Sequence, residues 1–122
     1  MAEVRGSVAC LDASPILSLL VGEPSEQAQA VHQLLESAAA RGERLWVFPT
    51  TVGEVAMTLD RAYKVSRADI AEELLGFLDH RALYLERGDV VRAALATFGA
   101  HNVPFYDALC CVPLYLAHAV PN

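Results

Sequence analysis

The chain has 122 residues, of which 54% are hydrophobic, and its formal net charge is −6. This length suits one domain with its own core, so we predict that residues 1–122 form a single domain. The negative charge argues against a nucleic-acid binder that works through positive charge alone, but not against a nuclease whose acids bind a cation.

Two further classes are disfavoured by the sequence. No apolar run reaches the roughly 18 residues that a membrane span requires, and no signal peptide is evident before Asp12. The three cysteines are odd in number and lack C-x-x-C spacing. We therefore expect no membrane association, a cytoplasmic location and reduced cysteines in the core rather than zinc ligands.

The first predicted elements are a short buried strand over Ser7–Leu11 and a helix that follows it. Ser14 and Pro15 suit the N-cap and the first position of this helix, and Gly22 ends it. Asp12 would lie at the carboxyl end of the strand, directly before the helix. Open α/β sheets bind ligands at that position.

The next predicted elements are a helix over 25–40, a strand over Leu45–Phe48 and a helix from Pro49 to about Lys64. Glu54 falls off the apolar stripe of the third helix, in what we expect to be its first turn. Two interpretations of Glu54 are open. It can be a functional acid, or it can form a capping box with Thr51, in which its carboxylate only accepts a backbone N–H.

The remaining elements complete an alternating pattern. Ser66 is expected to cap a helix that runs to Leu78, Ala82–Leu85 forms a third strand, and Asp89 caps a helix over Val90–Ala100. The resulting order, β-α-α-β-α-α-β-α-α, predicts a three-layer α/β domain with a parallel sheet.

The stretch from Val103 to Ala117 carries one charged side chain, Asp107, in a helix that is apolar nearly all round. Such a helix is normally buried, so we expect Asp107 to be desolvated and paired, bound to a cation or protonated. Pro113 is expected to kink this helix.

Three acids share the same isolation: Asp12, Glu54 and Asp107 have no basic residue as a near sequence neighbour. Three acids without local counterions suggest a shared cation, and carboxylate oxygens suit a hard metal. We expect these carboxylates to converge. The high apolar content also predicts a homodimer, because so small a chain should bury further surface.

Three segments resemble the PIN domain, in particular the VapC-type toxins of bacterial toxin–antitoxin pairs. They are V-A-C-L-D-A-S-P-I-L, P-T-T-V-G-E-V-A-M-T-L and F-Y-D-A-L, and together they span almost the whole chain. The resemblance implies that Asp12, Glu54 and Asp107 hold Mg²⁺ or Mn²⁺ in an RNA-cleaving site. It also implies a cognate antitoxin partner and supports the homodimer.

One departure from the family pattern concerns the end of the sequence. A fourth acid usually follows the last matched helix, on a further strand, and no such strand is predicted before Asn122. We therefore expect a PIN-like three-layer α/β/α fold whose C-terminal strand or strands are missing. The alternatives are a truncated sequence, completion of the sheet by a partner or swapped segment, and a degenerate member of low activity.

Three functions fit these observations. The first is a metal-dependent endoribonuclease acting as the toxin of a toxin–antitoxin pair. The second is a non-catalytic PIN-like interaction module, and the third is a phosphatase or DNA nuclease. Four residues are candidates for substrate binding. Arg61, Lys64 and Arg67 can hold RNA phosphates or form a solvated basic edge, and Ser14 can bind phosphate or a metal-bound water or act only as an N-cap.

Overall fold

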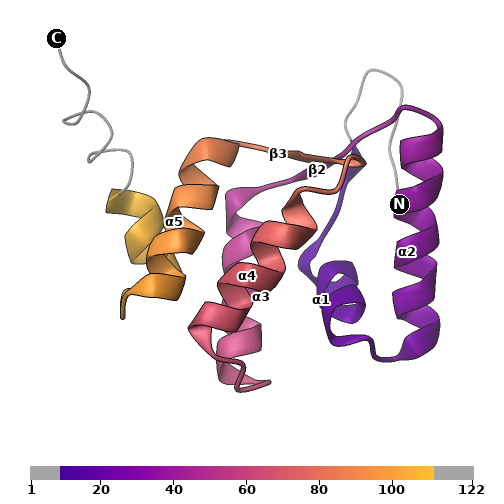
Figure 1. Cartoon of the computed structure of the whole chain (residues 1–122). Coiled ribbons are helices and arrows are strands. Elements are labelled where there is room, and N and C mark those ends of the chain that lie inside the picture. The colour runs from indigo at the N-terminus through magenta and orange to yellow at the C-terminus, as the bar shows by residue number, and fades with distance from the viewer. Residues whose placement is uncertain (1–8, 112–122) are drawn as a thin grey trace, which may run out of the picture.

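The computed structural model of the chain describes residues 9–111. Along these residues each strand is followed by two helices, as the sequence predicts. The elements are β1 (Ala9–Cys10), α1 (Ala13–Val21), α2 (Ser25–Ala40), β2 (Leu45–Val47), α3 (Pro49–Arg61), α4 (Arg67–Leu78), β3 (Leu83–Leu85) and α5 (Gly88–Ala100), followed by helical residues 105–111 (Figure 1).

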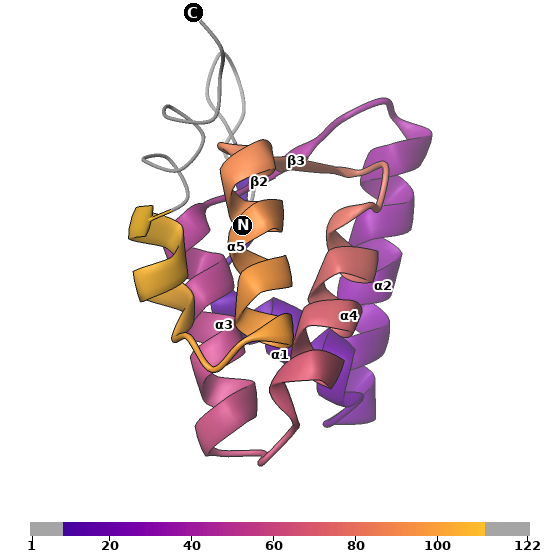
Figure 2. The same cartoon turned by 60° about the vertical axis from the view of Figure 1, so that its left-hand side comes forward.

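The sheet is parallel, with the strand order β1-β2-β3. Cys10 pairs with Trp46, and Trp46 pairs with Tyr84. Each step to the neighbouring strand passes through two helices, which is the connection that parallel pairing requires. The predicted α/β class and parallel sheet are confirmed, and the arrangement is consistent with a PIN-like α/β/α fold. In both views α1, α3, α4 and α5 lie on one side of the sheet (Figures 1 and 2).

The two faces of the sheet differ in burial. Leu45, Val47 and Leu83 are buried toward the helices and belong to one continuous hydrophobic core. On the opposite face, Cys10 and Tyr84 are exposed, and the ring centroid of Trp46 lies 4.5 Å from that of Tyr84. The strands therefore alternate between a core face and an aromatic face.

Two predicted helix boundaries are confirmed by their capping contacts. Gly22 ends α1 in the left-handed region, at φ 82°, and its N–H donates to the carbonyl of Ser18 at 2.8 Å. The hydroxyl of Ser66 caps α4 by accepting the backbone N–H of Asp69 at 3.2 Å. The predicted cap of α5 is wrong, because the helix begins at Gly88 and places Asp89 inside its first turn.

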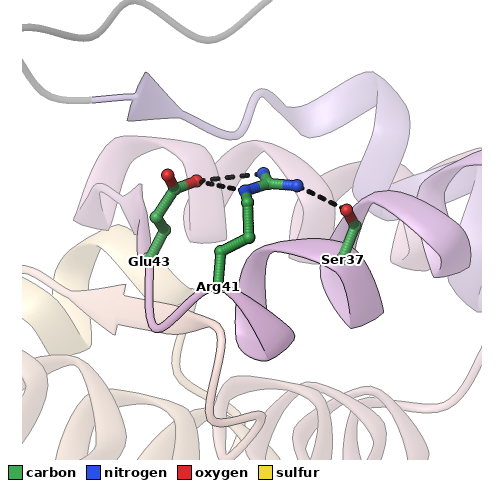
Figure 3. A network of polar contacts seen from close by, with 3 residues as sticks. All are labelled: Ser37, Arg41 and Glu43. Atoms are coloured by element: carbon green, nitrogen blue, oxygen red, sulfur yellow. Dashed lines mark hydrogen bonds and ion pairs between the residues drawn. The ribbon is translucent and has the colours of Figure 1, made fainter.

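A small polar network fixes the turn between α2 and β2 (Figure 3). The guanidinium of Arg41 donates to the hydroxyl of Ser37 and pairs with the carboxylate of Glu43, at 2.9 Å between Nη2 and Oε1. Gly42 adopts φ 71°, which a residue without Cβ adopts at little cost. Exposed ion pairs of this kind contribute about 0–1 kcal/mol, so the network shapes the turn more than it stabilises the protein.

The last helical segment differs from the prediction. It begins at Phe105 and buries Phe105 and Ala108, whereas Asp107 is exposed. The segment is thus amphipathic, and the expectation that Asp107 is desolvated is wrong. Pro113 lies outside the described residues.

The predicted environment of the cysteines is also wrong, because Cys10, Cys110 and Cys111 are free and exposed rather than in the core. Cys10 lies on the aromatic face of the sheet, and the other two lie at the solvent side of the last helical segment. Within residues 9–111, no helix is long and apolar enough to cross a membrane.

Candidate active site

Asp12 lies where β1 ends. The N–H of Leu11 donates to the carbonyl of Trp46 at 2.9 Å, which extends the strand pairing up to the residue before Asp12. Asp12 occupies the N-cap position of α1, but its carboxylate accepts no helix N–H. The side chain is exposed and has no ion pair with any residue between 9 and 111. It is therefore available to a ligand.

The alternative that Ser14 acts only as the N-cap of α1 is wrong. The helix starts at Ala13, so Ser14 is its second residue, and its side chain is exposed. Its position one residue past the start of the helix leaves the hydroxyl open to a ligand near Asp12.

Glu54 is not part of a capping box. α3 starts at Pro49, and Phe48 occupies the N-cap without a side-chain hydrogen bond, so Glu54 lies in the second turn. Thr51 is already inside the helix, and the alternative interpretation is wrong. Glu54 is exposed on the same helical stripe as Thr50, Met57 and Arg61, spaced four, three and four residues apart.

The residue before Asp107 contacts α3. The phenol ring of Tyr106 lies against Gly53, where a Cβ atom would lie 2.6 Å from the Tyr106 oxygen. The hydroxyl of Tyr106 donates to the carbonyl of Thr50 at 3.2 Å. Only a glycine at position 53 allows the ring so close to the helix axis. The Tyr106–Gly53 contact therefore joins the last helical segment to the turn of α3 that carries Glu54.

The electrostatic environment of Tyr106 relates it to Glu54. Burial raises the pKa of the Tyr106 phenol above its ordinary value, and the negative charge of Glu54 raises it further. The Glu54 carboxylate is therefore close enough to affect the residue that precedes Asp107. Glu54 and Tyr106, the residue before Asp107, therefore belong to one region of the surface.

Asp12 lies at the edge of the sheet where α3 also begins. β1 and β2 are parallel neighbours, so their carboxyl ends lie at one edge of the sheet, and α1 packs against α3. Among residues 9–111, no three His, Cys, Asp or Glu side chains are already grouped closely enough to hold a metal ion. Joint binding of a cation by the three acids remains a prediction.

The donor set suits a hard divalent cation. All three acids are exposed oxygen donors without an ion pair in the described part of the chain. Mg²⁺ keeps several waters and commonly takes only one or two direct carboxylates, so an open site with exposed acids fits it.

The three basic candidates are in different environments. Arg67 pairs with Asp60, at 3.6 Å between Nε and Oδ2, donates to the side chain of Asn102 at 3.1 Å and lies 5.0 Å above the ring centroid of Phe98. By contrast, Arg61 and Lys64 are exposed. Arg67 thus has a structural role whatever else it does.

Tyr106 is not among the residues that the sequence predicts for the site. One available signal was Gly53, since a glycine inside an exposed helix costs stability and usually has a packing reason. Its partner could not be identified without the fold, because the two residues are 53 positions apart.

The fold and the site define an α/β protein with a parallel sheet and an exposed acid, Asp12, at the carboxyl end of its first strand. Over 99 residues, 81% of this chain, the sequence is 28% identical to a VapC ribonuclease of Aquifex aeolicus (strain VF5), of which the match covers 73%. No family model matches the chain. No solved structure matches it.

Proposed function

We propose that the chain is a Mg²⁺- or Mn²⁺-dependent endoribonuclease of the VapC type. The observation that supports this most is the Tyr106–Gly53 contact, which joins the residue before Asp107 to the residue before Glu54. The similarity to the Aquifex aeolicus VapC ribonuclease supports the same activity independently.

In this proposal Asp12, Glu54 and Asp107 are the metal-binding and catalytic residues. A bound cation would supply an activated water and stabilise negative charge at the phosphate. Their exposure leaves room for waters and for a phosphodiester at the same surface. Ser14 can orient the substrate beside Asp12, and Arg61 and Lys64 can attract RNA phosphates at the far end of α3, some 10–15 Å from Glu54 along the helix.

The protein is further proposed to form a homodimer and to bind a cognate antitoxin. The aromatic face of the sheet supports an association surface, because Tyr84 is 39% exposed there, beside Trp46. Light scattering of the chain without an antitoxin tests the dimer, and a monomer at high protein concentration would contradict it.

The same aromatic face favours one alternative, a PIN-like interaction module without catalytic activity. Both functions use a partner, but only the ribonuclease requires the acids. RNA cleavage therefore separates the two.

The experiment is a substrate panel of single-stranded RNA, single-stranded DNA and a phosphomonoester, each incubated with Mg²⁺, with Mn²⁺ or with EDTA. The ribonuclease proposal predicts internal cleavage of RNA only, with either metal and not with EDTA. Asp107→Asn, which keeps the shape and removes the charge, should abolish it. Preferential cleavage of DNA would favour a DNA nuclease, and preferential cleavage of the phosphomonoester would favour a phosphatase. No cleavage by a protein that still dimerises would favour the interaction module.

A further inference from the structure

A pocket of about 110 Å³ opens where α3, α4 and the last helical segment meet. Its walls include Gly53 and Met57 of α3, and Phe105 and Tyr106 of the last segment. The volume is comparable to the roughly 150 Å³ engineered cavity that holds a benzene ring. The pocket can thus take up one ring of a flat aromatic group, and a second fused ring would lie at the rim, where Met57 is 37% exposed.

The pocket combines aromatic walls with polar groups in fixed positions. The rings of Phe98 and Phe105 meet edge to face, with centroids 6.5 Å apart. Asp60 and Arg67 also line the pocket, and their ion pair is held by the stacking of Arg67 on Phe98. The pair engages Oδ2 of Asp60, so Oδ1 can accept a hydrogen bond from a molecule in the pocket.

We propose that this pocket binds a nucleobase of the RNA substrate, and that Asp60 selects bases that carry an exocyclic amino group. This proposal rests on the proposed ribonuclease function and specifies its substrate. Proteins that recognise single-stranded RNA stack unpaired bases on aromatic side chains and on Arg, and read their edges through hydrogen bonds. A carboxylate accepts from an amino group, which adenine, cytosine and guanine have and uracil lacks.

The position of the pocket fits a subsite next to the cleavage site. Gly53 precedes Glu54 and Tyr106 precedes Asp107, so the wall of the pocket lies one residue, about 3.8 Å between Cα atoms, from each of two acids. Arg61 lines the pocket on its other side. A strand of RNA can therefore place a phosphate at the acids, its base in the pocket and the next phosphate toward Arg61.

Two other occupants fit less well. A phosphate would favour unpaired cations and backbone N–H groups, whereas Arg67 is already paired and Asp60 would repel an anion. An apolar side chain of a partner protein would leave the second oxygen of Asp60 and the guanidinium of Arg61 without a matching group.

The first test uses neutral nucleosides, which bear no phosphate and cannot be cleaved as RNA. The chain has two methionines, Met1 and Met57, so a methyl-labelled sample gives two methionine signals, and Met57→Leu assigns the one at the rim. Adenosine, cytidine, uridine and inorganic phosphate are titrated separately. Adenosine and cytidine should shift the Met57 methyl signal through the ring current of the base, and uridine should bind about fivefold more weakly, the effect of one lost hydrogen bond.

Asp60→Asn tests the selecting group, with Glu72→Gln on the exposed face of α4 as its matched control. Both variants remove one negative charge, so an effect of charge alone should appear in both. The proposal predicts that only Asp60→Asn loses the preference for adenosine and cytidine over uridine. If Asp60→Asn unfolds, a titration of the parent protein with purine riboside replaces it: this nucleoside lacks only the amino group of adenosine and should bind about fivefold more weakly than adenosine, and equal binding of the two would overturn the selection by Asp60.

Arg61→Gln and Lys64→Gln form a second matched pair in an RNA cleavage assay. Each removes one positive charge near the end of α3, but of these two side chains only Arg61 lines the pocket. Arg61→Gln should raise KM more than Lys64→Gln does, with little change in kcat.

The results separate this proposal from the proposed function. Cleavage of RNA by a protein whose Met57 signal responds to no nucleoside, or responds to all three equally, would overturn the base pocket and leave the ribonuclease intact. A response to phosphate alone would show an anion site instead. Selective nucleoside binding without cleavage would support the pocket and contradict the ribonuclease.

Discussion

The phenol ring of Tyr106 lies against the backbone of Gly53, so the residue before Asp107 contacts the residue before Glu54. The hydrogen bond from Tyr106 to the carbonyl of Thr50 fixes the direction of the ring. This contact relates two acids that are 53 positions apart in the sequence. The arrangement of the site thus depends on a residue without a side chain.

The first prediction concerns Gly53→Ala. The added methyl group would lie 2.6 Å from the Tyr106 oxygen, so the ring and the helical segment behind it must move. We expect a loss of about 1–3 kcal/mol in the free energy of unfolding, the usual effect of overpacking. Chemical denaturation measures this loss, and RNA cleavage should fall because Asp107 moves with Tyr106.

Gly76→Ala is the matched control. Gly76 is also a helical glycine, and nothing lies within 4 Å of the position its Cβ would take. Alanine there should stabilise α4 by up to about 1 kcal/mol and leave cleavage unchanged. Equal effects of the two substitutions would show that the Tyr106–Gly53 contact has no special role.

The second prediction concerns Tyr106 and pH. Because burial and then Glu54 raise the pKa of Tyr106, the folded protein keeps the phenol proton at a pH at which the unfolded chain has lost it. The contribution of this group is fully present below about pH 10 and is lost as pH rises from there through the folded pKa. Tyr106→Phe should remove that part of the alkaline loss of stability.

At neutral pH, Tyr106→Phe should cost about 0.5–1.5 kcal/mol, because the hydrogen bond to Thr50 disappears while the ring remains. Denaturation curves at several pH values, together with the ultraviolet titration of the tyrosines, check both statements. An unchanged alkaline profile in Tyr106→Phe would contradict the environment assigned to this residue.

The sequence predicted the order of elements because most local signals agreed with the fold, although Ser14 and Asp89 are not the caps of their helices. Glycine at the end of α1 and serine before α4 have the capping roles expected of them. The burial of the last helical segment could not be predicted from its apolar composition. Phe105 and Ala108 take up the core positions, and Tyr106 has its own contact on α3, so Asp107 faces solvent.

The candidate site was predictable only as a set of isolated acids. The sequence could not exclude a capping box at Glu54, because that depends on whether α3 begins at Pro49 or only after Thr51. It also could not separate Arg67 from its two basic neighbours, because Asn102 and Phe98, which hold it, belong to a distant part of the chain.

The third prediction follows from the contacts of Arg67. Arg67→Ala loses a partly exposed ion pair, a hydrogen bond and the stacking on Phe98, and should cost about 1–2 kcal/mol. Lys64→Ala, beside it in sequence, loses an exposed side chain and should stay within about 0.5 kcal/mol of the parent. Thermal unfolding of the two variants checks this. A larger loss for Lys64→Ala than for Arg67→Ala would refute the structural role of Arg67.

The fourth prediction concerns stability and metal. Like charges near one another destabilise the folded state, and a cation that binds only the folded protein stabilises it by about 2.7 kcal/mol at one hundred times its Kd. The melting temperature should therefore rise with the concentration of Mg²⁺ or Mn²⁺. Asp107→Asn should melt no lower than the parent in EDTA and should lose most of the response to metal. A variant that melts lower in EDTA and keeps the full response would make Asp107 a structural residue.

Calorimetric titration with Mn²⁺ tests most directly whether Asp12, Glu54 and Asp107 act as one site. The parent protein and the variants Asp12→Asn, Glu54→Gln and Asp107→Asn are titrated under the same conditions, with Glu72→Gln as the control for the loss of one surface charge. The shared site predicts that each of the three substitutions weakens Mn²⁺ binding at least about tenfold, a loss of about 1.4 kcal/mol, while Glu72→Gln binds as the parent does. Full binding retained by any two of the three variants would contradict a site built from these acids.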